Sequence, residues 1–157
     1  MIESATIIIR RGRAYIPVNA RVEDGGPFVN VEPVTVVDLN AIEIADALEA
    51  VASRGHPTIP SIPRDDWKLR KDPLLRAVGV SSWSKLASDS ASYGIGWSSS
   101  GVTIYLHSLD KKGRFSFDQN RIHFLAGTPS MIDIAYVVIE DARKLPELGF
   151  VDVSAKS

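Results

Sequence analysis

Short runs of β-branched and other apolar residues, separated by turn residues, fill much of the first forty positions. Three such runs, at residues 5–9, 14–18 and 28–37, predict β-strands. Pro17 and Pro33 interrupt the second and third runs. Because proline has no N–H to donate to a sheet, we expect strand edges or bulges at these positions. The N-terminal part of the chain is therefore predicted to contribute strands to an antiparallel sheet.

A helical spacing of apolar residues replaces the strand pattern between Asn40 and Gly55. Three apolar residues recur at intervals of four and three positions: Ile44, Leu48 and Val51. This spacing places them on one face of a helix. Asn40 and Glu43 have the spacing of a capping box, and a glycine such as Gly55 is typical of a helix C-terminus. We therefore predict a helix here that buries one face.

Two short helices are predicted in the middle of the chain, after an extended connector. Residues 56–63 contain three prolines, which exclude a helix there. Asp72 followed by Pro73 is a favourable helix start. Ser81 or Ser82 can cap a second helix soon afterwards.

A period of two returns near residue 90 and predicts strands again. We expect four of them, at residues 91–97, 102–108, 114–117 and 121–125. Short turns connect the first three, which favours antiparallel pairing in a meander. A last helix follows, because Ser130 and Asp133 have the capping-box spacing and the residues after them are apolar at helical intervals.

This order of elements predicts a single α+β domain over residues 1–157, with helices packed against an antiparallel sheet of N-terminal strands and the C-terminal meander. The composition agrees, since 45% of the residues are hydrophobic and 24% are charged. The formal net charge of −1 gives no argument for binding nucleic acid or a membrane surface.

Trp67 and Trp83 are the large aromatic residues of the central segment. Each lies in a short predicted helical turn, and Asp65 is placed to cap the first of these turns. Large apolar anchors hold short helices against a small sheet, so we predict that both tryptophans lie in the core. Contact with a partner is the alternative, since tryptophan is common at the energetic centre of interfaces.

No residue pattern points to catalysis, a cofactor or a metal ion. The chain has no cysteine, which excludes disulfides, thiolate ligands and cysteine nucleophiles. His107 and His123 could face each other from different predicted strands, but two histidines make only half of a metal site. Gly94 and Gly96 lie inside a predicted strand, so they indicate relief of crowding or strong twist there and not a phosphate loop.

An acidic stretch and a basic group stand out among the charged residues. Residues 38–49 contain no lysine or arginine and carry four carboxylates: Asp38, Glu43, Asp46 and Glu49. An exposed helix face explains this pattern, and the same face could steer a basic partner. Arg10, Arg11 and Arg13 form a basic group near the first turn. This group leaves a small nucleic-acid-binding or regulatory module as the alternative function.

Five short motifs follow one another along nearly the whole chain. They are Tyr15-Ile16-Pro17-Val18, Glu32-Pro33-Val34, the Ile59-Pro60 connector leading to Trp67, residues 74–83 and residues 102–105. In this order they resemble the motifs of the immunity proteins of bacterial contact-dependent growth inhibition systems. The strand near Tyr93 departs from the family pattern because it carries two glycines.

The resemblance implies a cytoplasmic protein that binds and blocks the toxic C-terminal domain of an exported effector. It implies no catalysis, no cofactor or metal, and no direct contact with nucleic acid or membrane. Many such toxins are nucleases, and a nuclease is basic where it grips phosphates. A blocker of that surface should be acidic. Our candidate toxin contacts are therefore Glu43, Asp46 and Glu49, with Tyr93 and Trp97 on the predicted meander as aromatic candidates.

Overall fold

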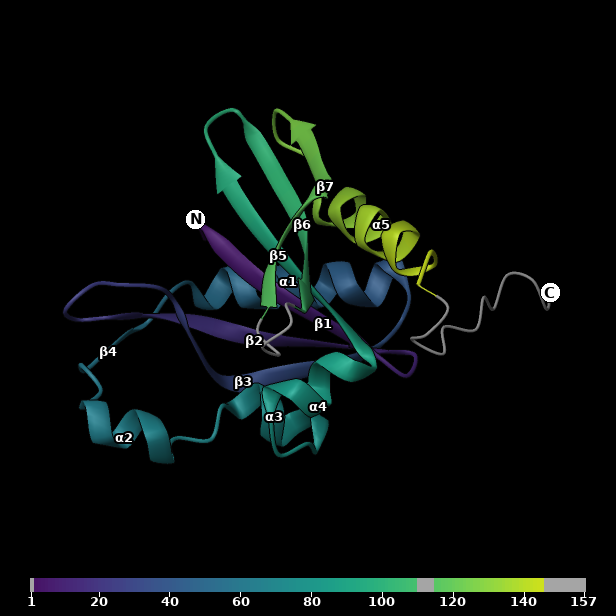
Figure 1. The fold of residues 1–157 in the computed structure, drawn as a ribbon. Coiled ribbons are helices and arrows are strands. Elements are labelled where there is room, and N and C mark those ends of the chain that lie inside the picture. The colour runs from purple at the N-terminus through teal and green to yellow at the C-terminus, as the bar shows by residue number, and fades with distance from the viewer. Residues whose placement is uncertain (1, 110–114, 146–157) are drawn as a thin grey trace.

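A computed structural model of the chain describes residues 2–109 and 115–145. The strands are β1 (Ser4–Arg10), β2 (Arg13–Val22), β3 (Val29–Asp38), β4 (Thr58–Ile59), β5 (Ser90–Ser98), β6 (Gly101–Leu109) and β7 (Phe115–Ala126). The helices are α1 (Ala41–Arg54), α2 (Arg64–Leu69), α3 (Pro73–Val78), α4 (Trp83–Ser88) and α5 (Met131–Ala142). Figure 1 shows the helices arranged around one twisted sheet, which confirms the predicted α+β class. Among the described residues, no helix has the length and apolar character needed to cross a membrane.

The strands follow the order β3-β2-β1-β5-β6-β7, and every neighbouring pair in this path is antiparallel. β4 is added by short parallel pairing with β2. β1 pairs with β5 along its whole length, from Ser4 opposite Gly96 to Arg10 opposite Ser90. One central strand therefore joins the N-terminal half of the sheet to the C-terminal half.

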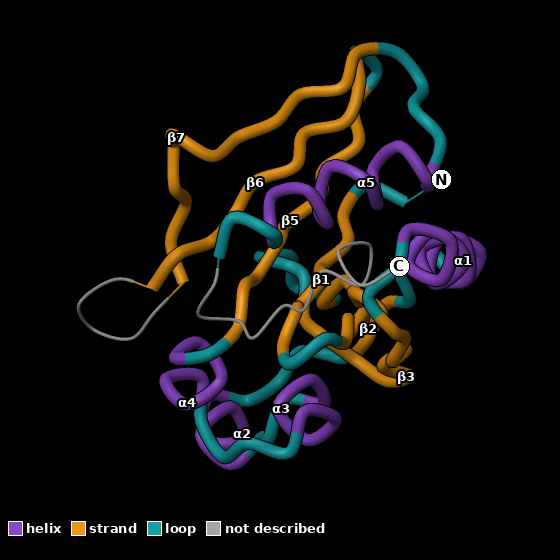
Figure 2. Tube along the Cα trace, turned by 90° about the vertical axis from the view of Figure 1, so that its right-hand side faces the viewer, coloured by secondary structure: helices purple, strands orange, loops and turns teal. Residues whose placement is uncertain are grey.

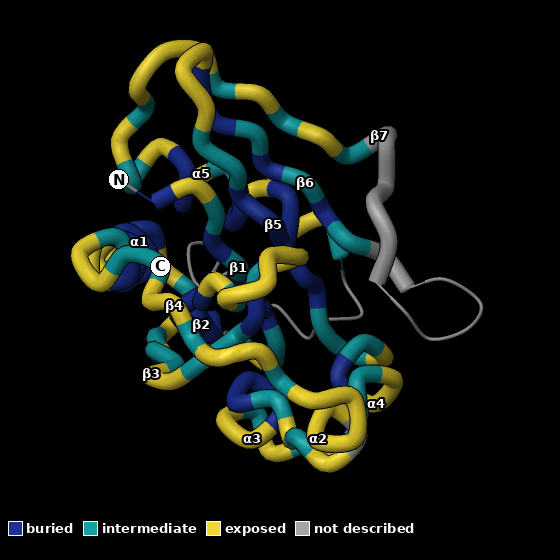
Figure 3. Tube along the Cα trace, turned by 90° about the vertical axis from the view of Figure 1, so that its left-hand side faces the viewer, coloured by how far each residue is buried: buried dark blue, intermediate teal, exposed yellow. Residues whose placement is uncertain are grey.

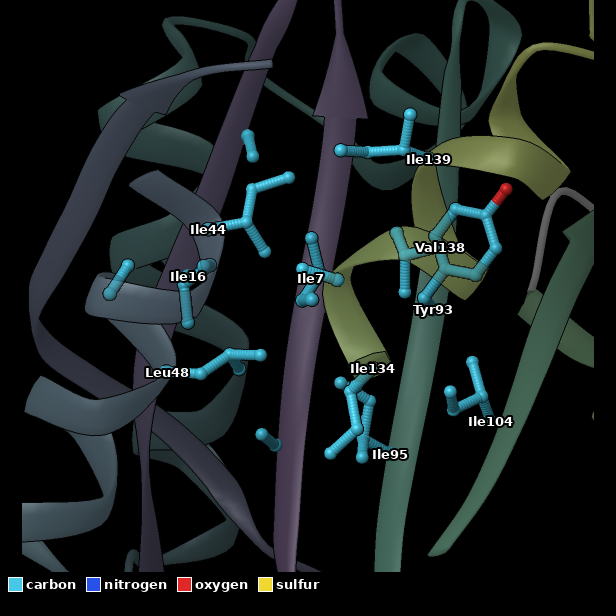
Figure 4. Packing of buried hydrophobic residues seen from close by; sticks show 14 of the residues in the cluster. Ile7, Ile16, Ile44, Leu48, Tyr93, Ile95, Ile104, Ile134, Val138 and Ile139 are labelled. Carbon is cyan, nitrogen blue, oxygen red and sulfur yellow. The ribbon is translucent and has the colours of Figure 1, made fainter. Parts of the chain in front are cut away.

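The larger core lies between the sheet and helices α1 and α5, which cover the same face (Figure 2). In Figure 4, Ile44 and Leu48 of α1 and Ile134 and Val138 of α5 lie on either side of Ile7 in β1. All five side chains are fully buried. The apolar stripes predicted for the two long helices thus close over the central strand.

A smaller core lies on the opposite face of the sheet, where α3 and α4 pack. Its buried members are Ile8, Tyr15, Leu74, Leu75 and Leu86. Trp83 is half-buried and packs against this cluster, which agrees in part with its predicted place in the core. Ile8 alternates with Ile7 and Ile9 along β1, so the same strand supplies both cores.

The predicted burial of Trp67 is wrong, because its side chain is 45% exposed. Trp67 belongs to α2, which lies beyond the proline-rich connector at the edge of the molecule and carries mostly exposed residues (Figure 3). Asp65 is not a cap either, since α2 begins after Pro63 and has no side-chain cap. Because α2 does not pack on a face of the sheet, Trp67 has no core to enter.

Hydrogen bonds at the helix starts confirm four predicted caps. Asn40 Oδ1 accepts a hydrogen bond from the Glu43 backbone N–H at 2.8 Å. The full capping box predicted there is not formed, because the Glu43 carboxylate accepts from the Asn40 side chain and not from its N–H. Ser82 Oγ accepts a hydrogen bond from the Lys85 N–H at 3.2 Å at the start of α4. Asp72 accepts one from a backbone N–H in the first turn of α3 at 2.8 Å. Ser130 and Asp133 form both bonds of a capping box at the start of α5. Local side-chain chemistry therefore determines where these helices begin.

The predicted four-stranded meander has three strands, because residues 121–125 and the described part of 114–117 both belong to β7. The predicted turn at residues 110–113 lies outside the described residues. Two pairs mark a shift in register between β6 and β7: His107 opposite Phe117, and Tyr105 opposite Ile122. β7 advances five positions while β6 advances two. The interruption in the sequence pattern is thus a bulge within one strand.

Gly94 and Gly96 make room for an aromatic ring from the neighbouring strand. A Cβ atom at Gly94 would lie 2.4 Å from a ring carbon of Tyr105, and one at Gly96 would lie 3.3 Å from the Tyr105 hydroxyl oxygen. The Tyr105 ring therefore lies across β5 on the face that α1 and α5 do not cover. This confirms that the two glycines relieve crowding.

Gly94→Ala should therefore lower the free energy of unfolding by about 1–3 kcal/mol, because the ring must leave its position. Gly96→Ala is the matched control and should change it by less than about 1 kcal/mol, since only the hydroxyl end must move and alanine reduces the entropy of the unfolded chain. Urea denaturation of both variants measures the difference. Equal effects would mean that Tyr105 does not require a glycine beneath it.

Candidate binding surface

The histidines do not form a metal site in the described residues. Nowhere in residues 2–109 and 115–145 do three or more His, Asp or Glu side chains gather as metal ligands. His107 and His123 do not face each other, since their partners across the sheet are Phe117 and Ile104. His56 Nε2 accepts a hydrogen bond from the Glu3 N–H at 2.9 Å, and its Nδ1 lies 2.8 Å from the Asn19 carbonyl oxygen. It thus joins the connector to the residue before β1 and to β2.

The main buried polar cluster surrounds Asp141, near the C-terminal end of α5. Asp141 is 3% exposed. The Tyr93 hydroxyl donates to its Oδ2 at 2.7 Å, and Arg121 Nη2 donates to the same oxygen at 2.5 Å. Arg121 Nε and His123 Nε2 lie 3.2 and 3.4 Å from Oδ1. Side chains of β5 and β7 are therefore fastened to α5 through one carboxylate.

The protonation of this cluster suits a structural role. Burial alone would raise the pKa of Asp141, but hydrogen bonds from Tyr93, Arg121 and His123 and the Arg121 charge outweigh it and lower the pKa. Burial and the hydrogen bond to Asp141 raise the pKa of Tyr93 far above its usual range. Asp141 therefore remains a carboxylate and Tyr93 remains a donor at neutral pH, which is the arrangement that holds the helix.

The candidate toxin contacts separate into exposed and buried residues. Asp46 and Glu49 are exposed on α1, and Glu43 is half-buried and accepts a hydrogen bond from the Asn40 side chain. Tyr93 is 1% exposed and belongs to the larger core, so we withdraw it as a surface contact. Trp97 is half-buried against the same core. Periodicity within one strand could not show that α5 covers this face of β5.

The basic group near the first turn is partly neutralised. Arg10 Nε lies 2.8 Å from Asp89, and Arg11 Nη2 lies 3.4 Å from the same carboxylate. The hydrogen bond from Arg10 lowers the pKa of Asp89. Arg13 is exposed. Two of the three arginines therefore form ion pairs with Asp89, just after α4. This pairing partly neutralises their charge and weakens the case for a basic nucleic-acid surface.

A hollow of about 400 Å³ lies between α2 and the β2–β3 hairpin. Trp67 and Phe28 contribute apolar walls, and Arg70 and Asp72 line it as well. Arg70 Nη2 donates to the Asn30 carbonyl at 2.5 Å, and its guanidinium lies 5.7 Å from the centre of the Trp67 ring. Asp72 caps α3, and burial raises its pKa. Arg70 and Asp72 therefore already form hydrogen bonds within the fold.

A second concave region lies where β7 meets the start of α5. Phe124 and Tyr136 line it and are 54% and 55% exposed. The sequence interpretation did not select either residue. The helical periodicity of α5 could have indicated that Tyr136 is exposed, because this residue falls outside the buried stripe of Ile134 and Val138. No comparable signal marks Phe124, whose exposure follows from the position of β7 at the edge of the sheet.

Asp141→Asn should lower the free energy of unfolding at pH 7 by about 2–3 kcal/mol, because Arg121 loses its buried partner. The folded-state pKa of Asp141 is lowered, so its contribution is complete above the unfolded-state pKa of about 4 and is lost as the pH falls through the folded pKa. The difference between the two proteins should therefore shrink in acid.

Urea denaturation at pH 7 and at about pH 3 checks this expectation. Asp46→Asn is the matched control and should stay within about 0.5 kcal/mol of the parent protein, since its carboxylate is exposed. A loss for Asp141→Asn that does not depend on pH would show that the charge of Asp141 is not what stabilises the fold.

Comparison with known proteins finds a similar fold without a match in sequence. No family model matches the chain, and no curated protein matches it. The fold is similar to that of a protein of unknown function from Neisseria meningitidis, with a TM-score of 0.61 at 11% identity over 90% of this chain and 94% of that one. It is similar to a chain from a CdiA-CT/CdiI toxin and immunity complex of Yersinia pseudotuberculosis, with a TM-score of 0.61 at 11% identity over 90% of this chain and 96% of that one. At this identity the likeness is one of fold.

Proposed function

We propose that this chain is an immunity protein of contact-dependent growth inhibition, which binds and neutralises the C-terminal toxin domain of an exported effector. The observation that carries the proposal is the near-full-length fold likeness to a chain from a toxin and immunity complex. The ordered sequence motifs support it independently. The protein acts in the cytoplasm by occupying a surface of the toxin, and it catalyses no reaction.

The chemistry of the described surface supports a basic partner such as a nuclease. α1 presents Asp46 and Glu49 to solvent, and neither carboxylate forms an ion pair among the described residues. A nuclease concentrates positive charge where it holds phosphates. Opposite charges across an encounter surface raise the association rate and exclude partners of the wrong sign. The outer face of α1 is therefore our candidate for first contact with the toxin.

The function is tested by the gene next to the one that encodes this chain. An immunity gene should follow a gene for a large exported protein, and the C-terminal fragment of that protein should co-purify with this chain. Co-expression should also protect cells from the growth arrest that the fragment causes. A fragment that arrests growth equally with and without this chain, and that does not co-purify with it, would disprove the proposal.

The role of α1 is tested by the variant Asp46→Lys/Glu49→Lys. Its association rate with the toxin fragment should fall by roughly threefold to tenfold at low salt, with a smaller change in dissociation. Glu43 stays unchanged in this variant because it accepts a hydrogen bond from the Asn40 side chain. The effect should shrink as the salt concentration rises from about 0.1 M to 0.5 M, where the screening length falls below about 5 Å.

The control is Glu23→Lys/Asp24→Lys, which changes the net charge equally at two exposed residues in the loop between β2 and β3. Stopped-flow association separates the two variants. If both slow association equally, only the net charge of the protein matters. If neither does, α1 is not part of the encounter surface.

A further inference from the structure

His56 lies where three segments of the chain meet. It follows Gly55, the C-cap of α1, and begins the connector that leads to α2. Its Nε2 lies 2.9 Å from the backbone nitrogen of Glu3, the residue before β1, and its Nδ1 lies 2.8 Å from the carbonyl oxygen of Asn19 in β2. The imidazole ring therefore ties the connector to the start of the central strand and to the neighbouring strand.

These two contacts fix the protonation state of the ring. A backbone N–H can only donate, so Nε2 must accept the hydrogen bond from Glu3 with a free electron pair. A carbonyl oxygen can only accept, so Nδ1 must carry the proton that it donates to Asn19. His56 is therefore neutral and in the Nδ1–H tautomer whenever both hydrogen bonds are formed.

Protonation of Nε2 removes this acceptor and sets two donors against each other. Both nitrogens of an imidazolium donate. The hydrogen bond to Asn19 can remain, because Nδ1–H is unchanged, but the hydrogen bond from the Glu3 N–H cannot. Glu3 is exposed, so its freed N–H can bond to water instead. Acid should thus release the segment before β1 and leave the connector attached to β2.

The charged groups around His56 give the protonated ring a different partner. Glu3 Oε2 lies 2.6 Å from Arg21 Nη2, and the hydrogen bond from Arg21 lowers the pKa of Glu3. The Glu3 carboxylate therefore stays ionised where a histidine gains its proton, and it can accept from Nε2–H. Positive charge comes from Arg21 and from Arg54 in the last turn of α1. The other packing partner, the Phe28 ring at 4.4 Å between ring centres, is uncharged.

We propose that His56 is a pH-sensitive latch on the first strand. The neutral ring holds the residue before β1 against the connector, and protonation exchanges this hydrogen bond for a contact with the Glu3 carboxylate. The Glu3 carbonyl also accepts a hydrogen bond from the Trp97 N–H at 3.0 Å, just beyond the pairing of Ser4 with Gly96. Acid should therefore loosen the outer end of the β1–β5 pairing.

NMR of the isotope-labelled full chain reads the latch directly. At about pH 8 the ring of His56 should be in the Nδ1–H tautomer, and at about pH 5 both of its nitrogens should carry protons. Over the same change, the hydrogen-exchange protection of the Glu3 amide should fall by roughly fivefold or more. Protection is taken relative to an unstructured peptide at the same pH. The Ile7 amide, in the middle of β1, should change by less than about twofold.

The variant His56→Gln separates the ring from other effects of acid. Glutamine accepts and donates hydrogen bonds but does not change its charge with pH. Protection of the Glu3 amide should therefore differ by less than about twofold between the two pH values in this variant. His123→Gln is the matched control, because it removes a histidine in β7, away from the latch. The pH-dependent fall at Glu3 should persist in it.

The latch is supported if the response at Glu3 disappears in His56→Gln alone while Ile7 stays unchanged. Three results would overturn it. They are an Nε2–H tautomer of His56 at the higher pH, constant protection of Glu3 while His56 gains its proton, or the same pH-dependent loss in His56→Gln as in the parent chain. The measurement needs no toxin fragment, so its outcome is independent of the proposed function.

Discussion

The antiparallel pairing of β1 with β5 is the interaction on which the rest of the structure depends. All seven residues of β1 face a residue of β5, from Ser4 and Gly96 to Arg10 and Ser90. The pairing joins segments from opposite halves of the sequence, so it closes a long loop that contains the four helices α1 to α4. Ile7 and Ile9 of β1 enter the core under α1 and α5, while Ile8 enters the core under α3 and α4. If β1 left the sheet, both cores would lose their central strand.

The candidate binding surface on α1 follows from this arrangement. α1 and α5 bury one face each in the larger core, and their outer faces carry Asp46, Glu49, Asp133 and Tyr136 into solvent. Asp141 fixes α5 relative to β5 and β7 through Tyr93 and Arg121. The buried ion cluster thus sets the position of α5 on the sheet. On the other face, the rings of Tyr105 and Phe124 lie over glycines of neighbouring strands.

The sequence predicted those features that depend on neighbouring residues. Helix starts at Asn40 and Ser130 were correct because a cap is a local hydrogen bond. The α+β class was correct because helical and strand periods separate clearly along the chain. The exposure of Trp67 and the burial of Tyr93 could not be predicted, since each depends on which element packs above it. The β7 bulge gave a visible break in the pattern, but a break does not distinguish a turn from a bulge.

Carboxylate footprinting of the chain, free and bound to the toxin fragment, tests the central claim most directly. A carbodiimide label on exposed carboxylates is read by mass spectrometry at each residue. The account predicts that Asp46 and Glu49 lose reactivity in the complex, while Asp24, Asp65 and Asp66 on the far side near α2 keep theirs. Protection of the residues near α2 with α1 still reactive, or no complex to label, would contradict it.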